Sequence, residues 1–271
     1  MNRFNIVIVI SLLFYFNQKL SGQLQPGAKQ IALSHSDVAN PNDVFSIFTN
    51  PAGLTQIKKT QFGIFYSPSP FGIKELANGF LAFNQPTNLG SFSIGAMNYG
   101  FELFKENRIY FGYSNNFSDQ FLFGISVFYQ IIKIENYGNT NFLNFSLGSI
   151  FLLNQDLSIG FSIHNPLRNK NYSSLTTNFR TGITYNILDN AKIHFAAFKE
   201  INFPISFSSG IEYDIIKLLS LRFGIQNNPN NFSGGLGINY SFFQIDYAIN
   251  SHIDLGLTHQ IGIILNFSDE N

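Results

Sequence analysis

The chain offers few side chains that could do acid–base, nucleophilic or metal chemistry, and their spacing is unfavourable for all three. None of its five histidines has the spacing of a metal site: His35, His164, His194, His252 and His259. It also lacks an HExxH motif, paired catalytic carboxylates and a nucleophile elbow. Ser162 and His164 would share one face of a strand, as in a barrel lipase, but we favour a structural or ligand-contacting histidine. We therefore expect no catalysis, no metal and no cofactor.

Charged residues inside the apolar segments are the more informative polar groups. Six of them occupy the phase that bulky apolar residues leave free: Arg108, Arg180, Lys192, Glu212, Arg222 and Asp246. On the inner wall of a membrane barrel such groups avoid lipid and can pair with one another. In a soluble β-sandwich, the alternative fold, they would face water instead.

A two-residue rhythm from about residue 60 to Phe267 supplies the elements that position these charges. Between residues 121 and 131, for example, apolar side chains at odd positions alternate with residues such as Gly124 and Ser126. Such alternation over segments of eight to eleven residues is typical of strands that cross a membrane as a β-barrel. The sequence therefore predicts an all-β fold, a transmembrane antiparallel up-and-down β-barrel of about 14 strands, with 12 as the alternative count.

Composition agrees with a membrane barrel and excludes other classes. Only 12% of residues are charged, against about 25% in ordinary soluble domains. The formal net charge is zero and no long basic run exists, so nucleic acid is not an expected partner. Cysteine is absent, which excludes disulfides, thiolate metal sites and an acylated cysteine.

The N-terminal region divides into two parts ahead of the barrel. Residues 1–22 read as a secretory signal peptide, with Arg3 before the apolar run from Ile6 to Phe16, and an uncleaved anchor is the alternative. Residues 23–59 lack the strand rhythm and are interpreted as a compact hatch or plug, with a disordered periplasmic tail as the alternative. Asp43 is expected to cap a short helical turn over residues 44–48. Residues 60–267 form the barrel and residues 268–271 a short periplasmic tail.

Glycines recur on the inward phase of successive strands, where they would make room for something. They are Gly112, Gly124, Gly148, Gly160, Gly182, Gly210, Gly224 and Gly262. Glycine weakens a strand unless a close approach requires it. A plug, a ligand or tight curvature of the wall would each explain the pattern, and the sequence does not choose between them.

Several motifs resemble those of a known family. They are Gly27–Leu33, Asp37-Val38-Ala39, Asp43, Asn50-Pro51-Ala52-Gly53-Leu54 and, near the end, Asp246–Ala248 with Leu255–Ile261. Together they resemble FadL-like outer-membrane β-barrels, and most closely the PorV and PorQ branch associated with type IX secretion. The resemblance spans nearly the whole mature chain and implies a multi-pass location in the bacterial outer membrane.

The resemblance also implies a non-enzymatic function and a site. The expected function is an accessory role in protein secretion or surface attachment, with a secretion translocon or exported proteins as partners beside outer-membrane lipid. The alternative is a passive channel for small hydrophobic molecules, such as a fatty-acid transporter. Hatch residues expected to bind ligand or gate the lumen are Asp37, Asp43, Asn50, Pro51, Ala52, Gly53 and Leu54. A separate hypothesis is that the lumen charges Arg180, Lys192, Arg222 and Glu212 bind Asp37 and Asp43.

Overall fold

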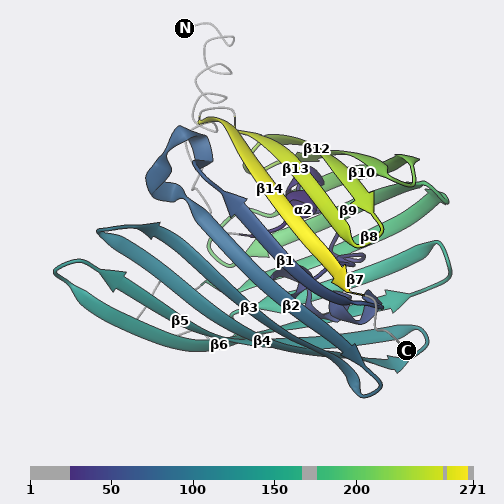
Figure 1. Ribbon diagram of the computed structural model, residues 1–271, viewed down its shortest axis with the longest axis horizontal. Coiled ribbons are helices and arrows are strands. Elements are labelled where there is room, and N and C mark those ends of the chain that lie inside the picture. Colours follow the sequence, from purple (N-terminus) through teal and green to yellow (C-terminus); the bar gives the residue numbers. More distant parts are fainter. Residues whose placement is uncertain (1–24, 167–175, 253–254, 268–271) are drawn as a thin grey trace, which may run out of the picture.

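The computed structural model describes residues 25–166, 176–252 and 255–267, and in them the chain forms one closed barrel (Figure 1). Every strand pairs antiparallel with its sequence neighbours, and β1 closes the barrel against β14, with Thr60 opposite Phe267. The strands are β1 (Thr60–Ser67), β2 (Asn78–Thr87), β3 (Gly90–Phe101), β4 (Phe104–Ser118), β5 (Phe121–Ile134), β6 (Gly138–Leu152), β7 (Leu157–His164), β8 (Asn178–Leu188), β9 (Ala191–Glu200), β10 (Ser206–Ile216), β11 (Leu219–Gln226), β12 (Asn231–Tyr240), β13 (Phe243–His252) and β14 (Gly256–Phe267). The prediction of 14 strands is confirmed.

Alternation along each strand puts apolar side chains on the outside of this barrel. In β5, Phe123 and Tyr129 are exposed on the outer face, whereas Leu122, Ser126 and Phe128 are buried inside. Phe111, Phe207 and Phe223 continue the exposed apolar surface on other strands. An outward apolar band on a closed barrel is the arrangement of an outer-membrane protein, because no strand edge is left to meet lipid.

The two ends of the barrel differ. At one end, which we call the turn end, strands are joined by links of two to four residues, such as Lys217 and Leu218 between β10 and β11. The opposite end, the loop end, carries longer connections, including residues 68–77 with the short 3-10 helices η2 (Pro70–Gly72) and η3 (Lys74–Leu76). Strands β4, β5 and β6 have 14 or 15 residues and extend past the 8-residue strands β1, β7 and β11 (Figure 1). Longer extracellular loops and short periplasmic turns are usual in such barrels.

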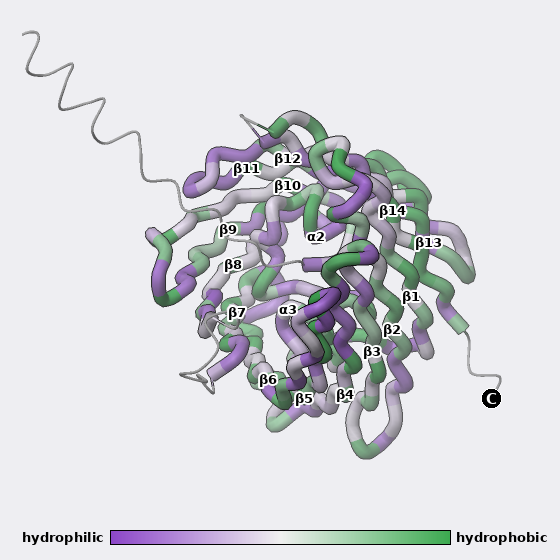
Figure 2. The backbone as a smooth tube through the Cα atoms, turned by 90° about the vertical axis from the view of Figure 1, so that its left-hand side faces the viewer, coloured by the Kyte–Doolittle hydropathy of each residue, from purple (hydrophilic) through white to green (hydrophobic). Residues whose placement is uncertain are grey.

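Residues 25–57, which we call the inner segment, run through the middle of the ring of strands (Figure 2). The segment contains α2 (Ala28–Ala32), α3 (Ser46–Thr49) and the 3-10 helix η1 (Pro51–Gln56). The carboxylate of Asp43 accepts a hydrogen bond from the Phe45 amide at 2.9 Å, but α3 begins only at Ser46. Asp43 therefore stabilises the turn before the helix. It is not the N-cap of the helix, contrary to the prediction from the sequence. No helix among the described residues is long and apolar enough to cross a membrane.

The inward glycines lie where the inner segment touches the wall. A Cβ atom on Gly124 would lie 2.3 Å from the carbonyl carbon of Pro51, and one on Gly160 would lie 2.4 Å from the Val38 oxygen. The inner segment crowds Gly148, Gly182, Gly210 and Gly224 in the same way, whereas a Cβ on Gly112 would first meet Ser93 of β3, and one on Gly262 would have ordinary contact distances. Of the three explanations that the sequence left open, close approach of the inner segment accounts for most of these glycines.

Candidate functional site

A cavity of about 410 Å³ lies inside the barrel near the loop end, and we call it the lumen cavity. Its apolar lining includes Phe65 of β1, Tyr99 of β3 and Phe198 of β9, and its polar lining includes Asn78 and Gln226. The loop between β1 and β2 joins the lining, because the Phe71 amide donates to Thr258 Oγ1 at 3.0 Å. Most of the lining surface is apolar, with many polar side chains among it, and the volume lies in the range of small-molecule sites.

Backbone strain is concentrated around this cavity. The described residues contain six non-glycine residues with positive φ, and four of them line it: Ser34, His35, Phe71 and Asn228, at φ 50°, 55°, 56° and 47°. Left-handed backbone is disfavoured for residues with a side chain, most of all for a bulky one such as Phe71. Strained residues persist only where the surrounding structure holds them, and they cluster at ligand sites and switch regions.

Arg180 is the charged group of the lumen cavity. Its side chain extends inward from β8 and packs on the ring of Phe198, with the guanidinium carbon 5.1 Å from the ring centroid. The residue is only 7% exposed, yet no carboxylate of the described residues lies within 4 Å of it. A buried cation without an anionic partner is costly, so the site favours a ligand or water that can accept its hydrogen bonds.

Two titratable residues of the inner segment accompany Arg180. Burial, with a smaller contribution from Arg180, lowers the pKa of His35 to about 3, so its imidazole is neutral at pH 7. Burial raises the pKa of Asp37 to about 6, although Lys29 opposes that rise. Asp37 Oδ2 has no hydrogen-bond partner in the described structure. Among the described residues neither forms an ion pair within 4 Å, so the expected contact of Asp37 with a lumen charge is not present there.

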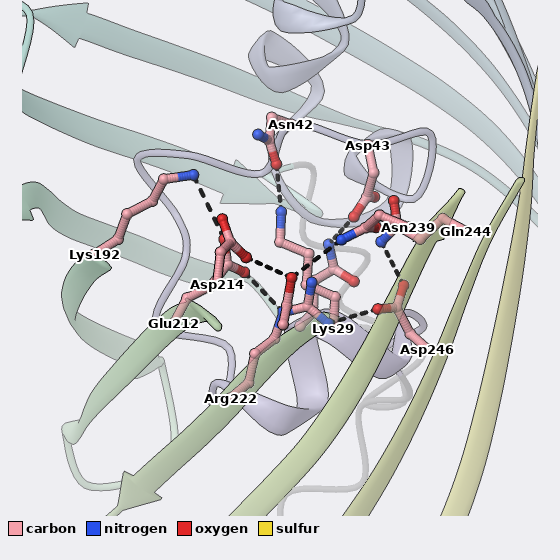
Figure 3. A network of polar contacts seen from close by, with 12 residues as sticks. Lys29, Asn42, Asp43, Lys192, Glu212, Asp214, Arg222, Asn239, Gln244 and Asp246 are labelled. Atoms are coloured by element: carbon pink, nitrogen blue, oxygen red, sulfur yellow. Dashed lines mark hydrogen bonds and ion pairs between the residues drawn. The ribbon is translucent and has the colours of Figure 1, made fainter. Parts of the chain in front are cut away.

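Four of the six lumen charges form one buried network on the opposite wall from β4 (Figure 3). Arg222 Nε contacts Glu212 at 2.7 Å and its Nη1 contacts Asp246 at 2.5 Å. Lys192 reaches the same glutamate at 3.5 Å. Arg222 spans strand β12 to reach Asp246 on β13. Gly237 of β12 makes this possible because it has no side chain: a Cβ atom there would lie only 2.6 Å from the Nη1 of Arg222. The arginine therefore pairs with carboxylates of the wall.

Polar groups of the inner segment lie beside this network but bond within the segment. Lys29 donates a hydrogen bond to Asn42 (Figure 3). Gln30 donates one to Asp43 at 2.6 Å. Among the described residues, no ion pair joins Asp43 to Arg222, contrary to the expected hatch contact. Arg108 is separate from both groups, because it pairs with Glu106 on its own strand at 2.6 Å.

Residues Asn50 to Leu54 pack against the wall and do not line the lumen cavity. The side-chain nitrogen of Asn50 donates to the backbone oxygen of Val38 at 2.8 Å, and the Asn50 side-chain oxygen accepts from the backbone N–H of Ala52 at 3.3 Å. Pro51 and Ala52 lie against Gly124, and a Cβ on Gly53 would lie 2.2 Å from the Pro41 oxygen. These contacts describe an anchored turn, and a gating or ligand role for Asn50–Leu54 stays a prediction.

Ser162 and His164 do not form a nucleophile–base pair. His164 Nδ1 lies 2.8 Å from Ser146 Oγ, and its Nε2 lies 2.5 Å from the Thr49 oxygen. Both ring nitrogens are thus engaged between β6, β7 and the inner segment, which is a structural arrangement. Ser162 Oγ has no hydrogen-bond partner in the part of the chain that the structure describes. Within those residues, no three metal-ligating side chains gather either.

Sequence reasoning found Arg180 but missed most of the cavity around it. Phe71, Asn228 and Ser34 lie in connections or in the inner segment, where no periodic pattern marks the inward side. The strained backbone of Ser34 and Phe71 has no sequence signal, because neither residue type favours positive φ.

Comparison with known proteins supports the fold and corrects one prediction. No family model and no curated protein matches the sequence. Solved structures match over nearly their whole length. The monoaromatic hydrocarbon channel CymD has a TM-score of 0.72 and 12% identity, covering 93% of this chain and 100% of that one. The Ralstonia pickettii toluene transporter TbuX has a TM-score of 0.71 and 13% identity, covering 89% and 98%. A Pseudomonas aeruginosa FadL homologue has a TM-score of 0.65 and 12% identity, covering 90% and 99%.

These structures share the FadL-like outer-membrane barrel fold with this chain. None of the three is named as a PorV or PorQ protein, and CymD and TbuX are named as a channel and a transporter. The prediction of a secretion accessory is therefore wrong, and the alternative of a channel is the better supported one. The predicted signal peptide, residues 1–22, and the tail, residues 268–271, lie outside the described residues.

Proposed function

We propose that this protein is a passive outer-membrane channel for small hydrophobic molecules, which enter through the lumen cavity. The main observation in support is the concentration of positive-φ residues around that cavity, beside Arg180, which has no carboxylate of the described residues within 4 Å. Such strain at a ligand-sized, largely apolar cavity is what a binding site with a movable lining requires. The solved hydrocarbon channels with the same fold support the proposal.

The inner segment is the proposed gate of this channel. It contacts strands on every side of the lumen, so a molecule passes only when part of it shifts. Ser34 and His35 are the part most suited to shift, because they combine positive φ with a position on the cavity wall. No energy source is needed, since the molecule moves down its own concentration gradient. The mature protein is proposed to begin after a signal peptide of residues 1–22.

The test is uptake by cells, because lipopolysaccharide-bearing outer membranes keep hydrophobic molecules out. Uptake of radiolabelled toluene would be measured in a Gram-negative host that lacks a channel of this kind, with the protein and its variants at equal surface levels. Ala196→Phe places a ring in the lumen cavity, which Ala196 lines. Ala96→Phe makes the same change on the outward phase of β3 and is the control. We expect Ala196→Phe alone to lower uptake to the level of cells without the protein, and equal uptake by all three would refute the proposal.

Arg180 offers a second arm of the same test. Arg180→Met keeps the length and the apolar packing on Phe198 but removes the buried cation. If the Arg180 cation binds the carboxylate of an amphiphile, uptake of oleate by Arg180→Met should fall severalfold while uptake of toluene is retained. Equal losses for the two compounds would instead indicate that Arg180 only holds the cavity open.

A further inference from the structure

A second cavity, of about 700 Å³, lies on the lipid-facing side of the barrel, and we call it the outer groove. Its walls are outward-facing aromatic rings of neighbouring strands, including Phe123 of β5, Phe161 of β7 and Phe179 of β8. Its volume falls within the range of about 300–1,000 Å³ that small-molecule sites occupy. Very little of its lining is polar, so the occupant must offer apolar surface to it.

Small outward residues create the hollow. The register places Ser149 of β6 opposite Phe161, Phe161 opposite Thr181, and Thr181 opposite Ala197 of β9. Three of these four positions in one row across the wall therefore carry small side chains, between rows of larger ones. The strands remain hydrogen-bonded along this row, so the hollow is a groove on the surface and not a hole through it. It is deep, because the inward-phase residues Gly148 and Ser162 also line it.

A lysine closes the groove toward the loop end. Lys199 lies opposite Phe179 in the register of β8 and β9, next to the connection from Ile201 to Ile205. Its Nζ donates to the Phe203 oxygen at 2.5 Å, which holds the ammonium at the rim. No carboxylate of the described residues lies within 4 Å of it, so donors remain for an anion. Lysine at the edge of an apolar membrane band characteristically places its charge in the headgroup layer.

We propose that the outer groove is a specific site for a lipid of the outer leaflet, whose acyl chain fills the groove and whose anionic headgroup binds Lys199. The apolar lining selects the chain, and the cation at the loop end selects the headgroup and its orientation. The loop end faces outward in barrels of this kind, which assigns the lipid to the outer leaflet. The groove lies on the outer face of the hydrogen-bonded wall and the proposed transport path on its inner face, and Arg180, Ala197 and Phe198 of that wall border both cavities.

The experiment is native mass spectrometry of the purified full chain in detergent, titrated with dioleoyl phosphatidylglycerol or dioleoyl phosphatidylcholine. We expect one tightly retained phosphatidylglycerol per chain, with severalfold weaker retention of the zwitterionic lipid. Ala197→Phe fills the groove and should abolish this retention, whereas Ala96→Phe, on the lipid-facing side of β3, should leave it unchanged. Lys199→Gln should remove the preference for the anionic lipid and leave weak binding of both.

Three results would overturn the proposal. One is equal lipid retention by Ala197→Phe and the unaltered protein, with both running as folded barrels on unheated gels. Another is an equal loss in Ala96→Phe, which would indicate ordinary contact with the surrounding detergent or lipid. The third is a dimer of the chain that carries no lipid and dissociates in Ala197→Phe, because the groove would then be an interface between two copies. Lys199→Gln adds little volume change, so it tests the headgroup contact even if Ala197→Phe fails to fold.

Discussion

Replacing Arg222 with alanine should cost the barrel a large part of its stability. The guanidinium holds two carboxylates, Glu212 of β10 at 2.7 Å and Asp246 of β13 at 2.5 Å, and the side chains of all three residues are less than 10% exposed. Without the arginine, Asp246 keeps only a hydrogen bond from Gln244, and Glu212 keeps the more distant Lys192. The change therefore leaves at least one buried carboxylate without a charged partner.

The size of the loss follows from this geometry. Breaking a buried ion pair by removing one partner costs about 3–5 kcal/mol, because the remaining charge is desolvated and uncompensated. Lys192 lies 3.5 Å from Glu212 and is 23% exposed, so it offsets part of the loss for one of the two carboxylates. We therefore expect about 3 kcal/mol for Arg222→Ala. Lys192→Ala removes the longer and wetter contact and should cost about 1 kcal/mol or less.

Urea unfolding in lipid vesicles measures both variants, with the folded fraction read from the mobility of unheated samples on gels. The triple variant with Arg222→Met, Glu212→Gln and Asp246→Asn removes every charge of the central contact, and we expect it to recover much of the stability. If Arg222→Ala and Lys192→Ala cost the same, the close contacts of Arg222 are not what stabilises this wall. If the triple variant is as unstable as Arg222→Ala, shape and not uncompensated charge accounts for the loss.

Two other perturbations test the inner segment. Gly124→Val should push Pro51 from the wall and expose the inner segment to limited proteolysis. Gly79→Val is the control, because a Cβ at Gly79 would meet nothing closer than 3.7 Å, and it should not increase cleavage. Equal cleavage of the two variants would refute the packing argument. Burial raises the pKa of Asp37 to about 6, so its protonated form favours folding, and stability should fall by up to about 3 kcal/mol as the pH rises from about 4 through 6. Asp37→Asn should abolish that pH dependence in urea titrations, and an unchanged slope would show that another group titrates.

The sequence predicts the wall better than it predicts what the wall encloses. Alternation along β5 is local information, since the side chain of each residue points opposite to that of its neighbour, and so Phe123 and Ser126 are assigned to faces without any tertiary structure. Glycines such as Gly124 and Gly160 indicated a close approach, but only the closed barrel identifies the approaching residues as Pro51 and Val38.

The charged residues show where sequence reasoning ends. Arg222 was placed correctly on the inner wall, yet its partners depend on the register of β10 to β13 and on the space left by Gly237, which no single strand reveals. Arg180 has the same pattern in the sequence, but no carboxylate in the described part of the chain lies within 4 Å of it. The resemblance that suggested a secretion role rested on motifs of the inner segment and of the last two strands. The first pack against the wall and the second are part of it, so these motifs report on the fold and not on a partner.

The inner segment also dictates the order in which this protein can be assembled. It ends three residues before β1, and β1 closes the ring by pairing with β14, the last strand to be synthesised. A ring that closed while empty would leave more than thirty residues to be threaded into a closed lumen and packed tightly against its wall glycines. The seam between β1 and β14 must therefore stay open until the lumen is filled. Strand β1, the first to be synthesised, is therefore among the last to complete its pairing. A mutation that weakens the packing of the inner segment should appear as a failure of β1 and β14 to pair.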